Sequence, residues 1–204
     1  MKFHDIEKNN IENGLGIRTV LWVSGCYHNC PGCHNPMTHD PEDGIEFEEE
    51  HMKELLDSLD SIDIKGLTIS GGDGLCYYPV EVSEVIQAVR DRFGDTKDIW
   101  LYTGFRLSNL LENVMIKNDS DVRECFNTII QNIDVLCDGP YQESCSDVEY
   151  HWVGSRNQRV IDMRETLKQS KVVFLEKSEE EKYTLNNEYD NRLLNKYTTE
   201  FYTT

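Results

Sequence analysis

The segment Leu67-Thr68-Ile69-Ser70-Gly71-Gly72-Asp73 (residues 67–73) carries the clearest structural pattern in this 204-residue chain. Its first four residues form an apolar run of strand length, which is typical of a strand buried in a parallel sheet. Two glycines and an acid then mark a turn. Beyond the turn, apolar residues recur with helical spacing from Val82 to Val89. The segment therefore predicts a strand, a tight turn and a helix, which together make one βα unit.

The same alternation extends on both sides of this unit. Further apolar runs of strand length occupy Thr19–Val23, Ile99–Tyr102 and Ile133–Cys137. Helical spacing marks three more stretches, which begin at Met52, Leu107 and Val122. Strands that alternate with helices predict an α/β fold with mostly parallel strands. Because the chain holds too few units for a closed eight-stranded barrel, we expect a partial barrel of six βα units or an open sheet.

Residues 165–204 differ in composition from the sequence before them. They contain no Gly, Pro or Cys, and they hold eight acids and six bases. The run Val172–Leu175 could form a strand, and strongly charged and then Asn-rich sequence follows it. We therefore divide the chain into a body, residues 1–164, and a C-terminal extension of unknown role, residues 165–204. We expect the extension to be loosely packed.

The charge and the apolar runs limit the classes of function. Lys and Arg number 20 against 38 Asp and Glu, a formal net charge of −18, so a dominant basic surface for nucleic-acid phosphate is not expected. Eleven of the acids lie in residues 39–63, where we interpret them as a solvated helix face rather than a docking site. No apolar run approaches the roughly 18 residues that span a bilayer, and residues 1–8 lack the apolar core of a signal peptide. We expect a cytoplasmic protein with neither nucleic-acid nor membrane partners.

The seven cysteines, an odd number, argue against a disulfide framework and favour metal binding or free thiols. Three of them, Cys26, Cys30 and Cys33, can converge on one site from one loop. A structural zinc site needs four ligands, and His28 or His34 could supply the fourth. A [4Fe–4S] cluster on three thiolates instead leaves one iron open, as a catalytic site requires. The spacing favours the cluster and keeps zinc as the alternative.

The position of these cysteines in the predicted fold adds to this interpretation. They follow the strand run Thr19–Val23, and Gly71-Gly72-Asp73 follows the next run. Both motifs therefore lie at carboxyl ends of strands, where α/β folds place their active sites. Glycines also allow a backbone to approach a ligand closely. Tyr102, Thr103 and Gly104 end the third run and could line the same pocket, although a turn with ordinary packing explains them nearly as well.

The Cys-x3-Cys-x2-Cys triad and Gly-Gly-Asp together resemble the radical S-adenosylmethionine (SAM) enzymes. More narrowly, the chain resembles the activating enzymes of the anaerobic (class III) ribonucleoside-triphosphate reductases. The resemblance covers residues 1–164 and leaves out the extension. The segments that carry it, in family order, are 13–18 (Asn-Gly-Leu-Gly-Ile-Arg), 23–35 (Val-Ser-Gly-Cys-Tyr-His-Asn-Cys-Pro-Gly-Cys-His-Asn), 67–73, 97–105 (Lys-Asp-Ile-Trp-Leu-Tyr-Thr-Gly-Phe), 134–139 (Asp-Val-Leu-Cys-Asp-Gly) and 152–158 (Trp-Val-Gly-Ser-Arg-Asn-Gln).

The chain departs from the family pattern at a few positions. The family usually has Pro where Leu15 and Gly74 stand, and Tyr where His34 stands. It usually has Arg at Val153 and Lys at Pro140. Gly32 differs from the aromatic residue of the wider superfamily but agrees with this family. No departure removes a thiolate or the Gly-Gly-Asp turn, so the departures bear on partner contacts more than on cofactor chemistry.

The resemblance implies a partial (βα)6 barrel of the radical SAM type that holds a [4Fe–4S] cluster and SAM. The cluster would be reduced by one electron and would cleave SAM to methionine and a 5′-deoxyadenosyl radical. This radical would take a hydrogen atom from a glycine of the partner reductase. The residues implied are Cys26, Cys30 and Cys33 as ligands of three irons, Gly71, Gly72 and Asp73 as contacts of the methionine amino group, Tyr102, Thr103 and Gly104 as pocket walls, and Asn157 and Gln158 as contacts of the partner.

The implied partners are the large subunit of the anaerobic reductase and an electron donor of the flavodoxin or ferredoxin type, and a homodimer is compatible with the sequence. One alternative is an activating enzyme of another glycyl-radical enzyme, such as pyruvate formate-lyase. Another is a non-enzymatic zinc-binding interaction module. An oxygen-sensitive cluster would also restrict the protein to a reducing, anaerobic cytoplasm.

Four cysteines lie outside the triad. Cys76 closely follows Gly-Gly-Asp, and three interpretations of it compete: a buried apolar residue, a thiol beside the metal ligands, or an extra ligand. Burial is the default for a free cysteine. Cys125 falls on an apolar helix face and Cys137 at a strand end, so both are expected in the core. Cys145 is expected to be a loop thiol.

Overall fold

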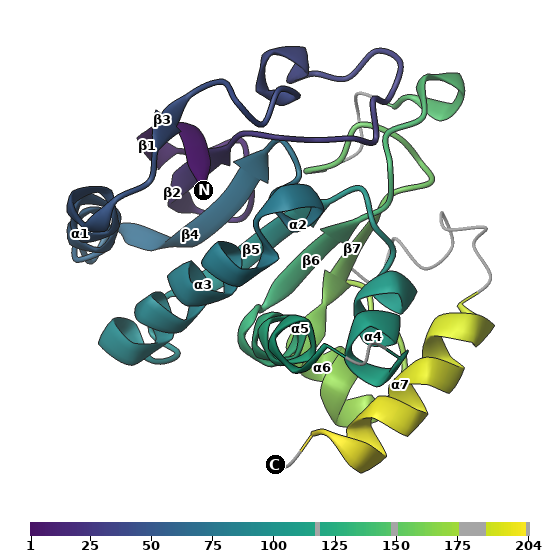
Figure 1. Cartoon of the computed structure of the whole chain (residues 1–204). Coiled ribbons are helices and arrows are strands. Elements are labelled where there is room, and N and C mark those ends of the chain that lie inside the picture. Colours follow the sequence, from purple (N-terminus) through teal and green to yellow (C-terminus); the bar gives the residue numbers. More distant parts are fainter. Residues whose placement is uncertain (117–118, 148–150, 176–186, 203–204) are drawn as a thin grey trace.

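A seven-stranded mixed sheet forms the centre of the computed structural model, which describes residues 1–116, 119–147, 151–175 and 187–202. The strand order is β3-β1-β2-β4-β5-β6-β7. The strands are β1 (Lys2–Asn10), β2 (Ile17–Val23), β3 (Ile45–Glu46), β4 (Ile64–Gly71), β5 (Asp98–Thr103), β6 (Val135–Asp138) and β7 (Arg159–Asp162). The mixed α/β class that the sequence predicts is confirmed (Figure 1).

The four central strands, β2, β4, β5 and β6, are parallel, and each overlaps one of the predicted apolar runs. The outer strands β1, β3 and β7 pair antiparallel. The expected six βα units are therefore not present in the described residues. The link from β1 to β2 is a short glycine turn, which joins antiparallel neighbours. Between β6 and β7 the described chain holds one short 3-10 helix, η2 (Glu143–Cys145), instead of a crossover helix.

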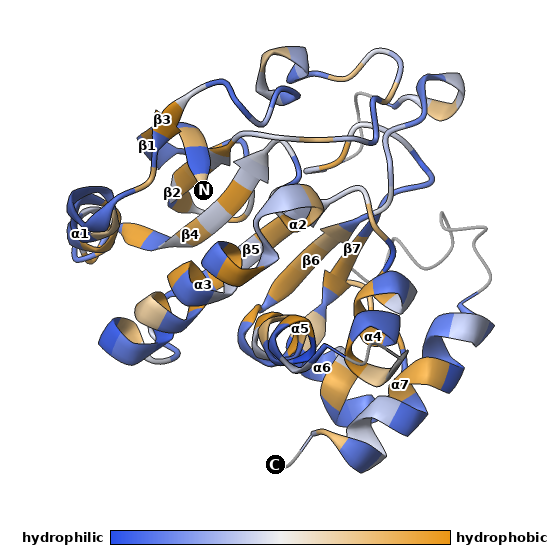
Figure 2. Ribbon diagram, viewed as in Figure 1, coloured by the Kyte–Doolittle hydropathy of each residue, from blue (hydrophilic) through white to orange (hydrophobic). Residues whose placement is uncertain are grey.

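Helices pack around the sheet (Figure 1). They are α1 (Glu49–Ser58), α2 (Gly74–Tyr77), α3 (Pro79–Phe93), α4 (Leu107–Ile116), α5 (Ser120–Asn132), α6 (Met163–Gln169) and α7 (Glu188–Glu200), with the 3-10 helix η1 (Pro36–Thr38). The four helices predicted from apolar spacing correspond to α1, α3, α4 and α5. Figure 2 shows hydrophobic residues along β6 and β7, whereas the helices around them carry both hydrophobic and hydrophilic patches.

Side chains from the central strands and from one face of each predicted helix make the core. Leu67 and Leu101 on the sheet, and Leu55, Val85 and Ile129 on the helices, are fully buried. Their burial explains why the central strands are apolar on both faces, since helices and connecting segments cover the sheet on each side. The parallel arrangement also sends the carboxyl ends of β4 and β6 to the same edge, at the upper right of Figure 1.

The C-terminal segment is more ordered than its composition indicates. Val172–Leu175 does not form a strand; Phe174 makes only an isolated bridge to Ile161. Helix α7 packs against α4, and its Leu194 and Tyr197 are fully buried. The Tyr197 hydroxyl donates to Asn127 Oδ1 on α5 at 2.7 Å. The described part of the extension is therefore packed on the body rather than loosely attached, and the division at residue 164 stays a prediction.

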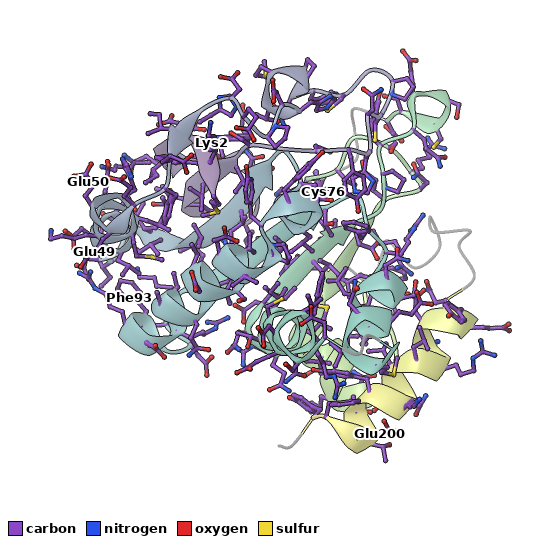
Figure 3. All side chains as sticks on the ribbon, in the orientation of Figure 1. Lys2, Glu49, Glu50, Cys76, Phe93 and Glu200 are labelled. Carbon is purple, nitrogen blue, oxygen red and sulfur yellow. The ribbon has the colours of Figure 1, made fainter. Side chains whose placement is uncertain are left out.

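Two surface features bear on partners. No helix in the described ranges combines the length and the apolar character needed to cross a bilayer. The acidic stretch includes α1, whose Glu49 and Glu50 Figure 3 labels at the left margin of the molecule, whereas Cys76 is labelled near its centre. Lys53 on this helix pairs with Asp57 at 2.5 Å, which is consistent with a solvated helix face.

Candidate metal centre

The loop that follows β2 presents the three cysteines of the triad. Gly25 adopts a φ of +88°, a conformation that favours glycine. The chain then runs beside residues 38 and 39, because Gly25 N–H donates to Thr38 O at 2.8 Å and Cys26 N–H to His39 O at 3.0 Å. A second turn, closed by Cys33 N–H to Cys30 O at 3.1 Å, brings the last two cysteines together. Main-chain hydrogen bonds thus fix the backbone of the loop.

The Gly71-Gly72-Asp73 turn is bonded directly to the base of this loop. Gly72 N–H donates to Val23 O, and Asp73 N–H donates to Gly25 O, both at 2.8 Å. A Cβ at position 72 would lie 2.6 Å from Gly25 O, so only glycine allows the two segments to approach this closely. The expectation that the two motifs lie at adjacent strand ends is therefore confirmed by the β2–β4 pairing.

The carboxylate of Asp73 joins three segments of the site. Its Oδ2 accepts hydrogen bonds from Thr103 Oγ1 at 2.8 Å and Gly104 N–H at 2.9 Å. The same oxygen lies 2.8 Å from His28 Nε2, and Oδ1 accepts from Leu75 N–H at 3.1 Å. Asp73 is only 3% exposed. Because the carboxylate is so fully engaged, the turn offers a ligand mainly the main-chain groups of its glycines.

His28, which the sequence offered as a possible zinc ligand, is held inside the site by its contact with Asp73. Its pKa is raised, chiefly by the hydrogen bond to Asp73. Its ring packs against Gly104, where an added Cβ would lie 2.5 Å from His28 Cδ2. Glycine at position 104 therefore makes room for the imidazole, a role that the sequence pattern alone did not indicate.

A cavity of about 650 Å³ lies above these strand ends, within the range of small-molecule sites. Nearly all of the predicted site residues line it: Cys26, Cys30, Cys33, Gly71, Gly72, Asp73, Tyr102, Thr103, Gly104 and Gln158. His39 also lines it, and its buried Nε2 has no hydrogen-bond partner among the described residues. The cavity therefore combines thiols, glycine backbone and an unsatisfied polar atom, as expected for a ligand site.

The thiols differ in their protonation. A hydrogen bond with the Cys76 side chain is the main cause that lowers the pKa of Cys26 to about 6. Burial raises the pKa of Cys30, while the main-chain N–H of Tyr141 acts in the opposite direction. Negative charge on Cys26 or Cys33 also raises the pKa of Cys30, so the three sulfurs interact electrostatically. Because the thiolate is the metal ligand, Cys26 is predisposed to bind metal at neutral pH.

The spacing of the sulfurs distinguishes a cluster from a single ion. Zn–S bonds of about 2.3 Å keep the sulfurs of one zinc site within about 4.6 Å of each other. In the described part of the chain, Cys26, Cys30 and Cys33 do not form a group within 4.8 Å, with or without His28 or His34. A cubane cluster binds each cysteine through a different iron, so wider spacing suits it. The donor set fits an iron–sulfur cluster better than zinc.

Asn157 and Gln158 hold the segment between β6 and β7 in place. Asn157 Nδ2 donates to Pro140 O at 2.7 Å, and Gln158 Nε2 donates to Gly139 O at 3.0 Å. Gln158 Oε1 accepts from Gly154 N–H at 3.0 Å. Asn157 does not line the cavity. Both side chains thus shape one wall of the site from within, and a contact with a partner stays a prediction.

The remaining cysteines are distributed as follows. Cys125 and Cys137 are buried in the core, and burial raises the pKa of Cys137. Cys145 lies in η2 and its thiol donates to Asn157 Oδ1 at 3.1 Å. Cys76 is half-buried beside the cysteine loop.

The fold and the site define a class, an α/β protein whose three loop cysteines, near the carboxyl ends of its parallel strands, suit an iron–sulfur cluster. The family model described as "4Fe-4S single cluster domain" matches residues 12–161. Curated relatives that the chain resembles carry the name anaerobic ribonucleoside-triphosphate reductase-activating protein. The protein of Enterobacteria phage T4 is 36% identical over 163 residues, 78% of this chain and 93% of its own length. The protein of Escherichia coli (strain K12) is 33% identical over 168 residues, 80% of this chain and all of its own length. The protein of Vibrio cholerae is 35% identical over 162 residues.

The chain belongs to the family of anaerobic ribonucleoside-triphosphate reductase-activating proteins. The family model ends before residue 165, so the extension lies outside it. The resemblance inferred from the sequence is confirmed.

Proposed function

We propose that this chain cleaves S-adenosylmethionine reductively at a [4Fe–4S] cluster and so forms the glycyl radical of an anaerobic ribonucleoside-triphosphate reductase. The observation that carries the proposal is the shared cavity of the three cysteines and the Gly71-Gly72-Asp73 turn, in a chain of this family. When bound, the cluster and SAM supply a one-electron cleavage that yields methionine and a 5′-deoxyadenosyl radical. The nucleotide is then a substrate of the partner and not of this chain.

The three thiolates have the first role in this proposal. Cys26, Cys30 and Cys33 would each hold one iron and leave the fourth open to the amino and carboxylate groups of SAM. The lowered pKa of Cys26 supports this, because it keeps that sulfur in the ligating form. The main-chain bonds that fix the loop support it as well, since ligands held in place need no ordering when the cluster binds.

The glycine turn and the third strand end have the second role. Gly71 and Gly72 would offer main-chain groups to the methionine amino group of SAM. Asp73 would keep that turn in position through its bonds to Thr103 and Gly104. Tyr102, beside them, would close the wall of the pocket and help to exclude water.

The proposal extends to the surroundings of the site. The parallel strands β2, β4, β5 and β6 would form a partial barrel of the radical SAM type, with the cofactors at their carboxyl ends. The partner would be the large subunit of the reductase, and the electron would come from a flavodoxin or ferredoxin type of donor. Asn157 and Gln158 would serve the partner by shaping the segment beside the cavity. The chain could act as a homodimer in a reducing, anaerobic cytoplasm.

A coupled assay tests this function. Anaerobically reconstituted protein is mixed with a reductant, SAM and the anaerobic reductase. Chromatography measures 5′-deoxyadenosine, and electron paramagnetic resonance (EPR) detects the glycyl radical. We expect both products, and a protein that releases no 5′-deoxyadenosine would overturn the proposal. Cleavage of SAM without a glycyl radical on the reductase, but with one on pyruvate formate-lyase, would instead contradict the assigned partner.

A further inference from the structure

The extension contributes two polar side chains from the start of α7. Asn187 directly precedes this helix, and Asp190 lies in its first turn. Asp190 is only 6% exposed, although an acid on a surface helix ordinarily faces solvent. Figure 1 shows α7 beside α4, with the first turn of α7 directed toward the carboxyl ends of the strands. Because the family model ends at residue 161, this helix is an addition to the matched body.

Asp190 holds the start of α4 together with a carboxylate from the sheet. Its Oδ1 accepts a hydrogen bond from Ser108 N–H at 2.9 Å. The preceding N–H, on Leu107, donates to Asp138 Oδ2 at 2.8 Å. The first N–H groups of a helix have no partner within the helix, so here one is bound from β6 and the next from the extension. Removal of the Asp190 carboxylate would leave a buried N–H at the start of α4 without its acceptor.

Arg159 links the two carboxylates. Its Nε donates to Asp138 Oδ1 at 2.8 Å. Its Nη1 donates to Asp190 Oδ2 at 3.0 Å and to Asn187 Oδ1 at 2.7 Å. One side of the guanidinium therefore binds β6 and the other side binds α7. These contacts join the extension to β6, β7 and the start of α4.

Residues next to these contacts in the sequence form part of the cavity wall. Gly139 directly follows the β6 carboxylate, Gln158 directly precedes the arginine of β7, and Gly104 lies in the turn before α4; all three line the cavity. Gly139 N–H donates to Phe105 O at 2.9 Å, which joins two of these wall segments. Asp190 is not among the described residues that line the cavity. It can therefore act on a bound ligand only through the wall segments.

We propose that the extension holds the wall of the cofactor cavity in place, with Asp190 as the positioning residue, so that the affinity for SAM depends on α7. The inference rests on the function proposed above. A wall segment that is bonded on both sides has fewer conformations to lose when a ligand binds, so less free energy is lost in ordering it. Asp190 thus supports the binding of SAM without contacting it.

Binding of SAM to the reconstituted protein with an oxidised cluster tests this role without turnover, because the cleavage requires reduction. Equilibrium dialysis with radiolabelled SAM measures the Kd of the wild type, Asp190→Ala and Asp190→Asn. We expect Asp190→Ala to raise the Kd by about three- to tenfold, as the loss of one hydrogen bond in the wall would. Asp190→Asn keeps an oxygen that can accept from Ser108 N–H, so its Kd should lie nearer to that of the wild type. All three proteins should bind the same number of irons.

Tyr197→Phe is the matched control on the same helix. It removes the hydrogen bond from Tyr197 to Asn127 on α5 but leaves the Asp190 contacts in place, so it should bind SAM like the wild type. Equal Kd values for Asp190→Ala and the wild type would overturn the inference. An equal rise in Kd for Tyr197→Phe would overturn it as well, because the effect would then be one of general stability.

Hydrogen exchange measured by mass spectrometry gives a second readout that needs no ligand. Peptides covering residues 103–108 and 138–141 should exchange faster in Asp190→Ala than in the wild type, whereas Tyr197→Phe should leave their exchange unchanged. If the wild type itself binds no SAM, it is the proposed function that fails. Unchanged exchange of both segments in Asp190→Ala would instead show that α7 does not hold the wall.

Discussion

The cysteine loop follows the carboxyl end of β2, and the Arg159 cluster lies at the carboxyl end of the parallel strand β6, yet their polar groups are used in opposite ways. In the loop, main-chain bonds fix the backbone and the thiols line an open cavity. In the cluster, Arg159 on β7 bonds to Asp138 on β6 and, at 3.0 Å, to Asp190 on α7. Asp138 is fully buried and Arg159 is 1% exposed. The difference separates groups kept for a ligand from groups that hold the fold.

The largest effect is expected when a thiol is removed from the cysteine loop. Cys30→Ala deletes one of the three iron ligands, so we expect loss of the cluster and of SAM cleavage. Iron analysis, the visible absorption spectrum and 5′-deoxyadenosine formation measure the effect. Cys145→Ser is the matched control and should retain all three. A Cys30→Ala protein that still holds its cluster and cleaves SAM would remove Cys30 from the site.

The second effect is expected when the Arg159 cluster loses its arginine. Arg159→Gln leaves the carboxylate of Asp138 buried without its main counter-charge, because the nearby Arg106 lies 3.6 Å away and is only a secondary partner. Losing one member of a buried ion pair costs about 3–5 kcal/mol of unfolding free energy. Urea denaturation under anaerobic conditions measures it. Lys53→Ala, which breaks an exposed pair, should cost less than about 1 kcal/mol. Equal losses for both variants would contradict the comparison.

The third effect concerns the packing of Gly104 against the His28 ring beside the cavity. Gly104→Ala places a methyl group where His28 lies, so the imidazole must move or the backbone must shift. Overpacking of this kind costs about 1–3 kcal/mol. We also expect weaker retention of the cluster, because His28 belongs to the cysteine loop. Glu84→Ala, at an exposed position on α3, is the control. A Gly104→Ala protein as stable as the wild type and with full iron content would contradict this role of Gly104.

The smallest effect concerns the extension. Asp190 accepts a hydrogen bond from Ser108 N–H at 2.9 Å, near the start of α4, and pairs with Arg159. Asp190→Asn keeps an oxygen for these donors but removes the charge, and Asp138 still balances Arg159. We expect a loss of about 1 kcal/mol in unfolding free energy. Glu200→Gln, at the exposed end of α7, should leave stability unchanged. If Asp190→Asn matched Arg159→Gln in cost, Asp190 and not Asp138 would be the main partner.

The central part of the fold could be predicted from the sequence because its strands are buried on both faces. Runs such as Leu67–Ser70 and Ile99–Tyr102 carry that signal in their composition alone. Strand β1 was missed, since only Phe3, Ile6 and Asn10 are buried along its nine residues and register shifts interrupt its alternation. The prediction of a strand over Val172–Leu175 was wrong for a different reason. This apolar run packs under α7 and makes only an isolated bridge to β7.

The site was predictable only where its residues are close in the sequence. Spacing indicated the triad Cys26, Cys30 and Cys33, and the strand end indicated the Gly-Gly-Asp turn. The bond from His28 to Asp73 joins two different loops. Local spacing does not specify such contacts. The antiparallel return of β7 likewise depends on a connection without a crossover helix, which the family resemblance did not reveal.

The metal content of the anaerobically purified protein tests the central claim most directly. Inductively coupled plasma analysis, paired with EPR of the reduced sample before and after SAM is added, gives both the metal and its open coordination site. The account predicts about four irons per chain, little zinc, and a reduced-cluster spectrum that changes when SAM binds. A colourless protein with one tightly bound zinc per chain would contradict it.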